Sequence, residues 1–160
     1  MGGWRLAASE FAGPHMTILA LDPGTTETAF VLWDGRRILE ADHLPNAEIR
    51  QILIGREYDA VACEMIASYG MAVGKEVFET CVWIGRFVEV ARVEPRLVYR
   101  RDAKLHLCHS PRAKDANVRQ ALIDRLGPQG TKKNPGPTYG MRSHLWAALA
   151  VAVYAGDVKE

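Results

Sequence analysis

The sequence contains few cysteines, almost no net charge and no long hydrophobic run. Its three cysteines, Cys63, Cys81 and Cys108, form no Cys-x-x-Cys pair, so we expect reduced thiols in a reducing compartment. No apolar run reaches the roughly 18 residues that cross a bilayer. The longest run, residues 145–155, is short and rich in alanine, which favours a buried helix. We therefore expect a cytoplasmic protein with no membrane partner.

Length and composition narrow the class further. The chain has 160 residues, of which 48% are hydrophobic and 24% charged, values that exclude collagen-like, mucin-like and wholly disordered proteins. It is too short for a two-lobed kinase or a complete dehydrogenase, and it contains no internal repeat. Regular patterning begins at Met16. We interpret residues 1–15 as a leader or expression remnant, with a native flexible arm as the alternative, and residues 16–160 as a single domain.

The order of predicted elements indicates the fold class. Apolar runs bounded by turn residues predict strands at 17–21, 28–33, 36–43, 58–63 and 96–99. Helical spacing and caps predict helices at 46–55, 75–93, 102–107, 115–126 and 141–155, with an exposed loop at 129–140. Three strands followed by alternating helices and strands predict an α/β protein with a mixed five-stranded sheet flanked by helices.

Two acidic residues follow predicted strands. Asp22 comes after the first strand and Glu64 after the fourth, and parallel strands bring such ends to one edge of the sheet. Two converging carboxylates favour a hard divalent cation, Mg²⁺ or Mn²⁺, between them. The alternative for Asp22 is a turn residue before Pro23-Gly24, and the alternative for Glu64 is a surface carboxylate. An Asp-x-Gly-Thr-Thr run also occurs in phosphate-binding hairpins of the sugar-kinase and actin superfamily, but that fold needs two large lobes.

The last predicted helix carries His144, whose imidazole could bind a metal or orient a water; a local hydrogen bond is the alternative. Residue 147 lies on the same helical face, where a ligand would complete a site with His144. The sequence has Ala147 there, which has no donor or acceptor on its side chain.

The net charge of +1 conceals two opposed parts. Residues 1–95 have a net charge of −6, residues 96–144 of +8 and residues 145–160 of −1. Such asymmetry is typical of phosphate binding, with a solvated basic surface as the alternative. The predicted DNA-binding side chains in the basic part are Arg100, Arg101, Lys104, Arg112, Lys114, Arg119, Lys132, Lys133 and Arg142.

Two apolar features have more than one interpretation. Tyr69 follows Glu64 in a glycine-containing loop and could stack on an unpaired base or fold back on the core. The helix at 75–93 has a broad apolar stripe that includes Phe78, Val82 and Trp83. This stripe could be entirely core, or it could pair with a second copy of the chain across a two-fold axis.

Three segments together resemble one family, the RuvC-type Holliday junction resolvases, and in particular their phage-encoded branch. The segments are Ile18-Leu-Ala-Leu-Asp22-Pro-Gly-Thr-Thr, Val61-Ala-Cys-Glu64 and His144-Leu-Trp-Ala-Ala-Leu-Ala-Val-Ala152, with Lys114 to Leu122 similar to the family's basic helix. The resemblance implies a ribonuclease-H-like fold and a homodimer that cuts four-way DNA junctions by paired symmetric nicks, using two Mg²⁺ or Mn²⁺ ions per active site. It assigns catalysis and metal binding to Asp22, Glu64, His144 and position 147.

The sequence departs from this family at position 147, where the pattern has aspartate. We interpret Ala147 as an Asp→Ala change that impairs cleavage and preserves junction binding. The alternatives are a non-catalytic junction-binding homologue, in which Ala147 is native, and an RNA-processing nuclease of the same fold.

Overall fold

The structure is a computed structural model that describes residues 15–160; the predicted leader, except His15, lies outside the described residues. Its strands are β1 (Ile18–Asp22), β2 (Glu27–Trp33), β3 (Ile38–Pro45), β4 (Ala60–Met65) and β5 (Arg96–Tyr99). Its helices are α1 (Asn46–Gly55), α2 (Lys75–Val90), α3 (Arg100–Cys108), α4 (Asp115–Leu126) and α5 (His144–Asp157). No helix in the described range is both long and apolar enough to cross a membrane.

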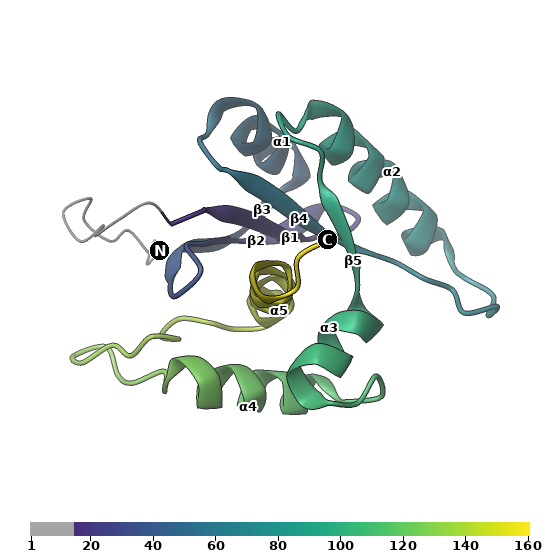
Figure 1. Cartoon of the computed structure of the whole chain (residues 1–160). Coiled ribbons are helices and arrows are strands. Elements are labelled where there is room, and N and C mark those ends of the chain that lie inside the picture. Colours follow the sequence, from purple (N-terminus) through teal and green to yellow (C-terminus); the bar gives the residue numbers. More distant parts are fainter. Residues whose placement is uncertain (1–14) are drawn as a thin grey trace.

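The strands form one mixed sheet in the order β3-β2-β1-β4-β5. β1 pairs antiparallel with β2, and β2 with β3, whereas β4 runs parallel to both β1 and β5. Helices α1 and α2 cover one face of the sheet, while α5 lies on the other face with α3 and α4 outside it (Figure 1). The prediction of a mixed five-stranded sheet flanked by helices is confirmed.

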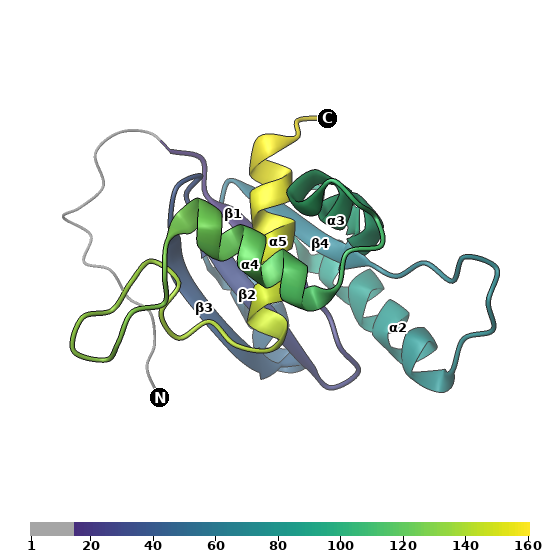
Figure 2. The ribbon, with the colours of Figure 1, turned by 90° about the horizontal axis from the view of Figure 1, so that it is seen from below.

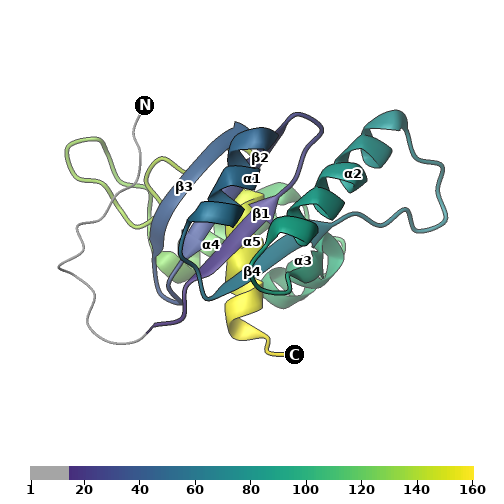
Figure 3. The ribbon, with the colours of Figure 1, turned by 90° about the horizontal axis from the view of Figure 1, so that it is seen from above.

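Alternation along the strands divides the core into two apolar clusters. Ile18, Ala20 and Ala62 face α5, where Leu149 and Val151 are also fully buried. The intervening residues of β1 and β4 face α1 and α2. Because α5 is apolar all round, it can pack between the sheet and the outer layer of α3 and α4. Figure 2 shows α5 crossing the sheet beneath α4, and Figure 3 shows α1 and α2 on the opposite face.

Several element boundaries differ from the sequence predictions. Glu64 lies within β4 rather than after it, because β4 continues to Met65 through its pairing with β5. The last helix begins at His144 rather than at Met141. The helix at 46–55 is confirmed, but Asn46 does not cap it. Its amide instead accepts a hydrogen bond from Thr28 Oγ1 (2.5 Å) and donates one to the carbonyl of Gly24 (3.0 Å).

The loop after Asp22 is held closely against the sheet. A side chain at Gly24 would place its Cβ 2.5 Å from the carbonyl oxygen of Glu27, so the turn requires glycine. The buried amide of Asn46 fixes the same turn from the start of α1. These contacts fix the chain immediately after Asp22 at the carboxyl edge of β1.

Candidate active site

The acidic residues of the two central parallel strands meet at one edge of the sheet. Leu21 of β1 is in register with Cys63 of β4, so Asp22 and Glu64, one residue further, lie side by side. Asp22 continues the face of Ala20, and Glu64 that of Ala62, so both point toward α5. The sequence prediction that these carboxylates converge therefore agrees with the geometry.

The start of α5 brings His144 to the same edge. Its Nδ1 lies 3.0 Å from Oδ2 of Asp22, while the imidazole remains largely exposed. The preceding residue, Ser143, has a φ of 50°, an unusual value for a residue other than glycine. Such strain costs free energy and is concentrated at functional sites. The backbone that positions His144 is therefore one of the strained points of the described fold.

Burial and mutual repulsion make the carboxylate pair hard to ionise. Burial, and to a smaller extent the neighbouring charge of Asp22, together raise the pKa of Glu64 to about 8. Burial also raises the pKa of Asp22 to about 6, although its hydrogen bond with Glu64 opposes the rise. Arg100 lowers the pKa of both carboxyl groups. Burial and the closeness of the two carboxyl groups therefore both disfavour the state in which each carries a negative charge.

The donor chemistry of this pair fits a divalent cation. Oxygen ligands suit Mg²⁺ and Mn²⁺, and a cation would offset the repulsion between two buried carboxylates. Within residues 15–160, however, no three His, Cys, Asp or Glu side chains form a ready-made metal centre. Cys63 is not an available ligand, because burial raises the pKa of its thiol and the charges of Glu64 and Asp22 raise it further. Asp22 and Glu64 would hold the ion, with His144 beside them.

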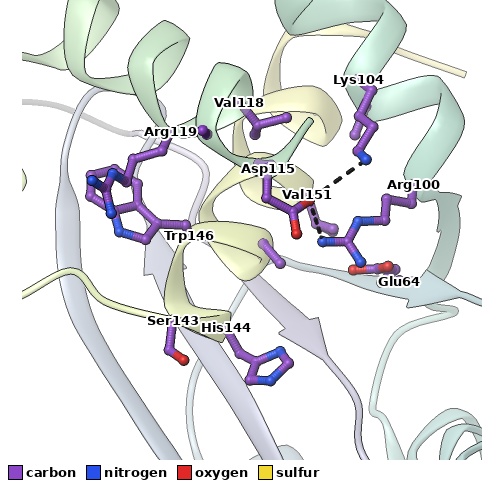
Figure 4. A pocket seen from close by; sticks show the side chains of 14 residues that line it. Glu64, Arg100, Lys104, Asp115, Val118, Arg119, Ser143, His144, Trp146 and Val151 are labelled. Atoms are coloured by element: carbon purple, nitrogen blue, oxygen red, sulfur yellow. Dashed lines mark hydrogen bonds and ion pairs between the residues drawn. The ribbon is translucent and has the colours of Figure 1, made fainter. Parts of the chain in front are cut away.

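A cavity of about 490 Å³ opens beside the carboxylates, between α3, α4 and α5. Its wall includes Glu64, His144 and Ala147, so position 147 faces the site, as its helical spacing from His144 predicts. The apolar wall includes Trp146 and Val151 (Figure 4). The methyl group of Ala147 leaves this part of the wall without a ligand.

The predicted DNA-binding residues are distributed over several surfaces. Arg100, Lys104 and Arg119 line the cavity. The remaining predicted residues are exposed but do not line the cavity. They lie at the start of α3, in the segment before α4 and in the long loop between α4 and α5; they are Arg101, Arg112, Lys114, Lys132, Lys133 and Arg142.

Three of the predicted DNA contacts lie in two loops that project on opposite sides of the molecule. Tyr69 is 62% exposed in the loop between β4 and α2, with a φ of 52°. Lys132 and Lys133 lie in the loop between α4 and α5. The two loops extend away from each other in every view (Figures 1, 2 and 3). The structure therefore does not gather all of these residues at the carboxylate edge.

Two residues near the site were missed by the sequence analysis. Asp115, the first residue of α4, lines the cavity and pairs with Arg100, with 2.7 Å between Oδ1 and Nη2. The ring of His43, on β3, lies 5.7 Å from the ring of His144. Neither residue belongs to a recognisable motif, and both reach the site only through tertiary packing. An acidic residue within the strongly basic segment 96–144 was the one available signal for Asp115.

Comparison with known proteins establishes the class of fold. The sequence matches no protein-family model and no curated protein. The structure is similar to that of Thermus thermophilus RuvC, with a TM-score of 0.62 and 20% identity, covering 87% of this chain and 92% of that chain. T. thermophilus RuvC in complex with Holliday junction substrate matches equally well, over 88% and 92% of the two chains.

The chain therefore has a ribonuclease-H-like α/β fold. Within that class its arrangement is the one seen in RuvC, and the sequence prediction of this fold is confirmed.

Proposed function

We propose that this protein is a RuvC-like, metal-dependent endonuclease that binds four-way DNA junctions, with cleavage impaired by Ala147. The observation that carries the proposal is the convergence of Asp22 and Glu64 beside His144 on a RuvC-type fold. The similar RuvC was solved with a Holliday junction substrate, which makes branched DNA the first substrate to test. The domain assigned to this activity is residues 16–160.

The proposed chemistry is hydrolysis of a phosphodiester bond. Bound Mg²⁺ or Mn²⁺, two ions per site in an intact enzyme, would supply Lewis-acid activation of water. Asp22 and Glu64 provide the carboxylate ligands. His144 holds a proton-accepting nitrogen at the exposed edge, within reach of a water or phosphate. Ala147 has no carboxylate to add to Asp22, Glu64 and His144, so the negative charge that would hold a second ion is absent.

The decisive experiment restores a carboxylate with Ala147→Asp. A labelled four-way junction is incubated with the original chain and the variant in Mg²⁺ or Mn²⁺. We expect the variant to cut at least a hundredfold faster, because an added carboxylate completes the ligand set. The Asp22→Asn/Ala147→Asp double variant is the control and should not cut. Equal rates for the original chain and Ala147→Asp would refute the assignment of position 147.

A non-catalytic junction-binding protein is the second candidate, and the apolar side chain of Ala147 in the cavity wall favours it. Affinity measurements compare a four-way junction, linear duplex and structured RNA in EDTA. Preference for the junction with no cutting by Ala147→Asp supports this candidate. Preference for RNA supports instead an RNA-processing nuclease of the same fold.

We further propose that the active form is a homodimer assembled through α2. Phe78 and Val82, one turn apart on this helix, are 63% and 54% exposed. A pair of exposed apolar side chains on one helical face suits a two-fold contact. Disulfide cross-linking of Phe78→Cys at micromolar concentration, with Glu48→Cys on α1 as the control, tests the contact. A chain that remains monomeric at that concentration would refute it.

A further inference from the structure

The cavity beside the carboxylates contains more basic than acidic side chains. Arg100, Lys104 and Arg119 line it, against Glu64 and Asp115. Positive charge is therefore built into the wall of a site whose carboxylates would bind a cation. Of these basic residues, Arg100 is the one whose charge acts on both carboxyl groups, those of Asp22 and Glu64.

Sheet register places Arg100 two residues beyond Val98, the partner of Glu64 on the neighbouring strand. β5 runs parallel to β4, with Val98 opposite Glu64 and Tyr99 opposite Met65. The chain then enters α3 at Arg100, so this residue stands at the same carboxyl edge, one strand from Glu64. Figure 4 shows the guanidinium of Arg100 between the carboxyl groups of Glu64 and Asp115.

Asp115 holds the guanidinium in this place. Its Oδ1 accepts a hydrogen bond from Arg100 Nη2 at 2.7 Å and lies 3.6 Å from Lys104 Nζ. The first turn of α4 is fixed in turn, because the Asn117 side chain accepts a hydrogen bond from the backbone N–H of Lys114 at 3.0 Å. Asp115, whose side chain is largely exposed, is thus a positioning residue at the start of α4, on the side of Arg100 away from Glu64 (Figure 4).

Arg100 also acts electrostatically on the pair. It lowers the pKa of both Asp22 and Glu64, so its charge is felt at each carboxyl group. A guanidinium remains charged at any physiological pH and presents donors along more than one edge. With one edge on Asp115, Arg100 is half exposed and retains donors that can reach a phosphate.

We propose that Arg100 is a residue of the cleavage site: its guanidinium supplies a permanent positive charge beside Asp22 and Glu64 and binds the phosphate that is cut. The inference rests on the proposed nuclease function. Arg100 also weakens the binding of divalent cations, because its positive charge competes with them for the same carboxylates. With Ala147 contributing no charge, Arg100 supplies a positive charge that a second ion would otherwise supply.

This competition predicts two effects of opposite direction. Arg100→Ala removes the competing charge, so Mn²⁺ should bind about tenfold more tightly. The same change removes a contact to the phosphate, so cutting by the Ala147→Asp chain should be about a hundredfold slower. Arg100→Lys retains the charge and should leave Mn²⁺ affinity within about twofold of the original. A residue with a purely structural role would not produce tighter metal binding together with slower cutting.

The experiment measures Mn²⁺ binding to the full-length chain by calorimetry and junction cutting in the Ala147→Asp background. Arg50→Ala, an exposed arginine of α1 on the opposite face of the sheet, removes the same charge and should change neither. Urea unfolding midpoints verify that each variant folds, which the half-exposed side chain of Arg100 favours.

The outcomes separate this inference from the proposed function. If Arg100→Ala matches Arg50→Ala in both measurements, the role of Arg100 is refuted and the nuclease proposal stands. If the Ala147→Asp chain does not cut any junction but Mn²⁺ affinity rises as expected, the nuclease proposal fails and the electrostatic role of Arg100 is supported. If neither the original chain nor the Ala147→Asp chain binds Mn²⁺ or cuts a junction, the nuclease proposal and the role of Arg100 are both overturned.

Discussion

Individual carboxyl groups at the site are held at the expense of fold stability. The folded-state pKa of Glu64, about 8, lies above the ordinary value of 4.5, and that of Asp22, about 6, lies above 3.8. Folding therefore favours their protonated forms, and the stability they contribute is present at low pH and lost as the pH rises through the folded-state pKa values. The carboxylate pair therefore lowers the stability of the fold at neutral pH.

Glu64→Gln should therefore stabilise the protein in the absence of divalent cations. The neutral amide avoids the loss that ionisation of Glu64 imposes between about pH 4.5 and pH 8. We expect a gain in unfolding free energy of about 4 kcal/mol at pH 8 and almost none at pH 4.5. Urea unfolding in EDTA across this range measures it, with exposed Glu57→Gln as the control. A gain that does not depend on pH would contradict the assigned burial.

At the scale of elements, the end of α5 is tied to α3 and α4 by one acidic residue. Asp157 Oδ2 lies 2.7 Å from His106 Nε2, and its Oδ1 accepts a hydrogen bond from Arg125 Nη2 at 2.6 Å. The hydrogen bond from Arg125 lowers the pKa of Asp157, and that from His106 lowers it further. Since α5 also carries His144 at its other end, this contact helps to fix the helix that completes the site.

Asp157→Asn should destabilise the fold in a pH-dependent way. A carboxyl group with a lowered pKa stabilises the fold above its unfolded value of 3.8, and this stability is lost as the pH falls through the folded value. We expect a loss of about 1 kcal/mol at pH 7, reduced by partial solvent screening, and little loss in strong acid, where Asp157 is protonated in both the folded and the unfolded state. Thermal unfolding at both pH values measures it. Asp124→Asn, which removes the same charge from α4, should have a smaller effect at pH 7.

The elements were predictable where local signals agree with tertiary pairing. Asp115–Leu126 follows from its own pattern, and the structure reproduces it. Boundaries were wrong where neighbouring elements decide them: β4 extends past Glu64 because β5 pairs with it. Asp22 and Glu64 were identified because an acidic residue at the end of an apolar strand can be recognised within a single segment of the sequence. The contact between Arg100 and Asp115 could not be identified from the sequence, because it depends on how α3 packs against α4.

At the scale of the whole molecule, the opposed charges of the sequence become opposed faces. The acidic first part supplies the sheet's β1 to β4 with α1 and α2, whereas α3, α4 and the loop before α5 belong to the segment of net charge +8. Figure 1 shows these basic elements on the α5 side of the sheet. The overall charge of +1 thus gives no indication of how strongly this side attracts phosphate.

The separation of the basic cavity from the loop that carries Lys132 and Lys133 leads to a prediction about branched substrates. This loop extends away from the loop of Tyr69, so DNA that contacts both must span the molecule (Figure 2). Each of Lys132→Ala and Lys133→Ala should reduce the slope of log affinity against log salt by about 1 for a four-way junction, because one phosphate contact is lost. For a short duplex that covers only the cavity, the slope should not change.

Fluorescence anisotropy over a series of salt concentrations in EDTA measures both slopes without cleavage. Arg50→Ala, on the acidic side of the sheet, is the charge-matched control and should leave both slopes unchanged. Equal reductions for junction and duplex would mean that the loop binds phosphate without regard to branching. A reduction confined to the junction would mean that the width of the basic side, rather than the cavity alone, distinguishes a four-way junction from linear DNA.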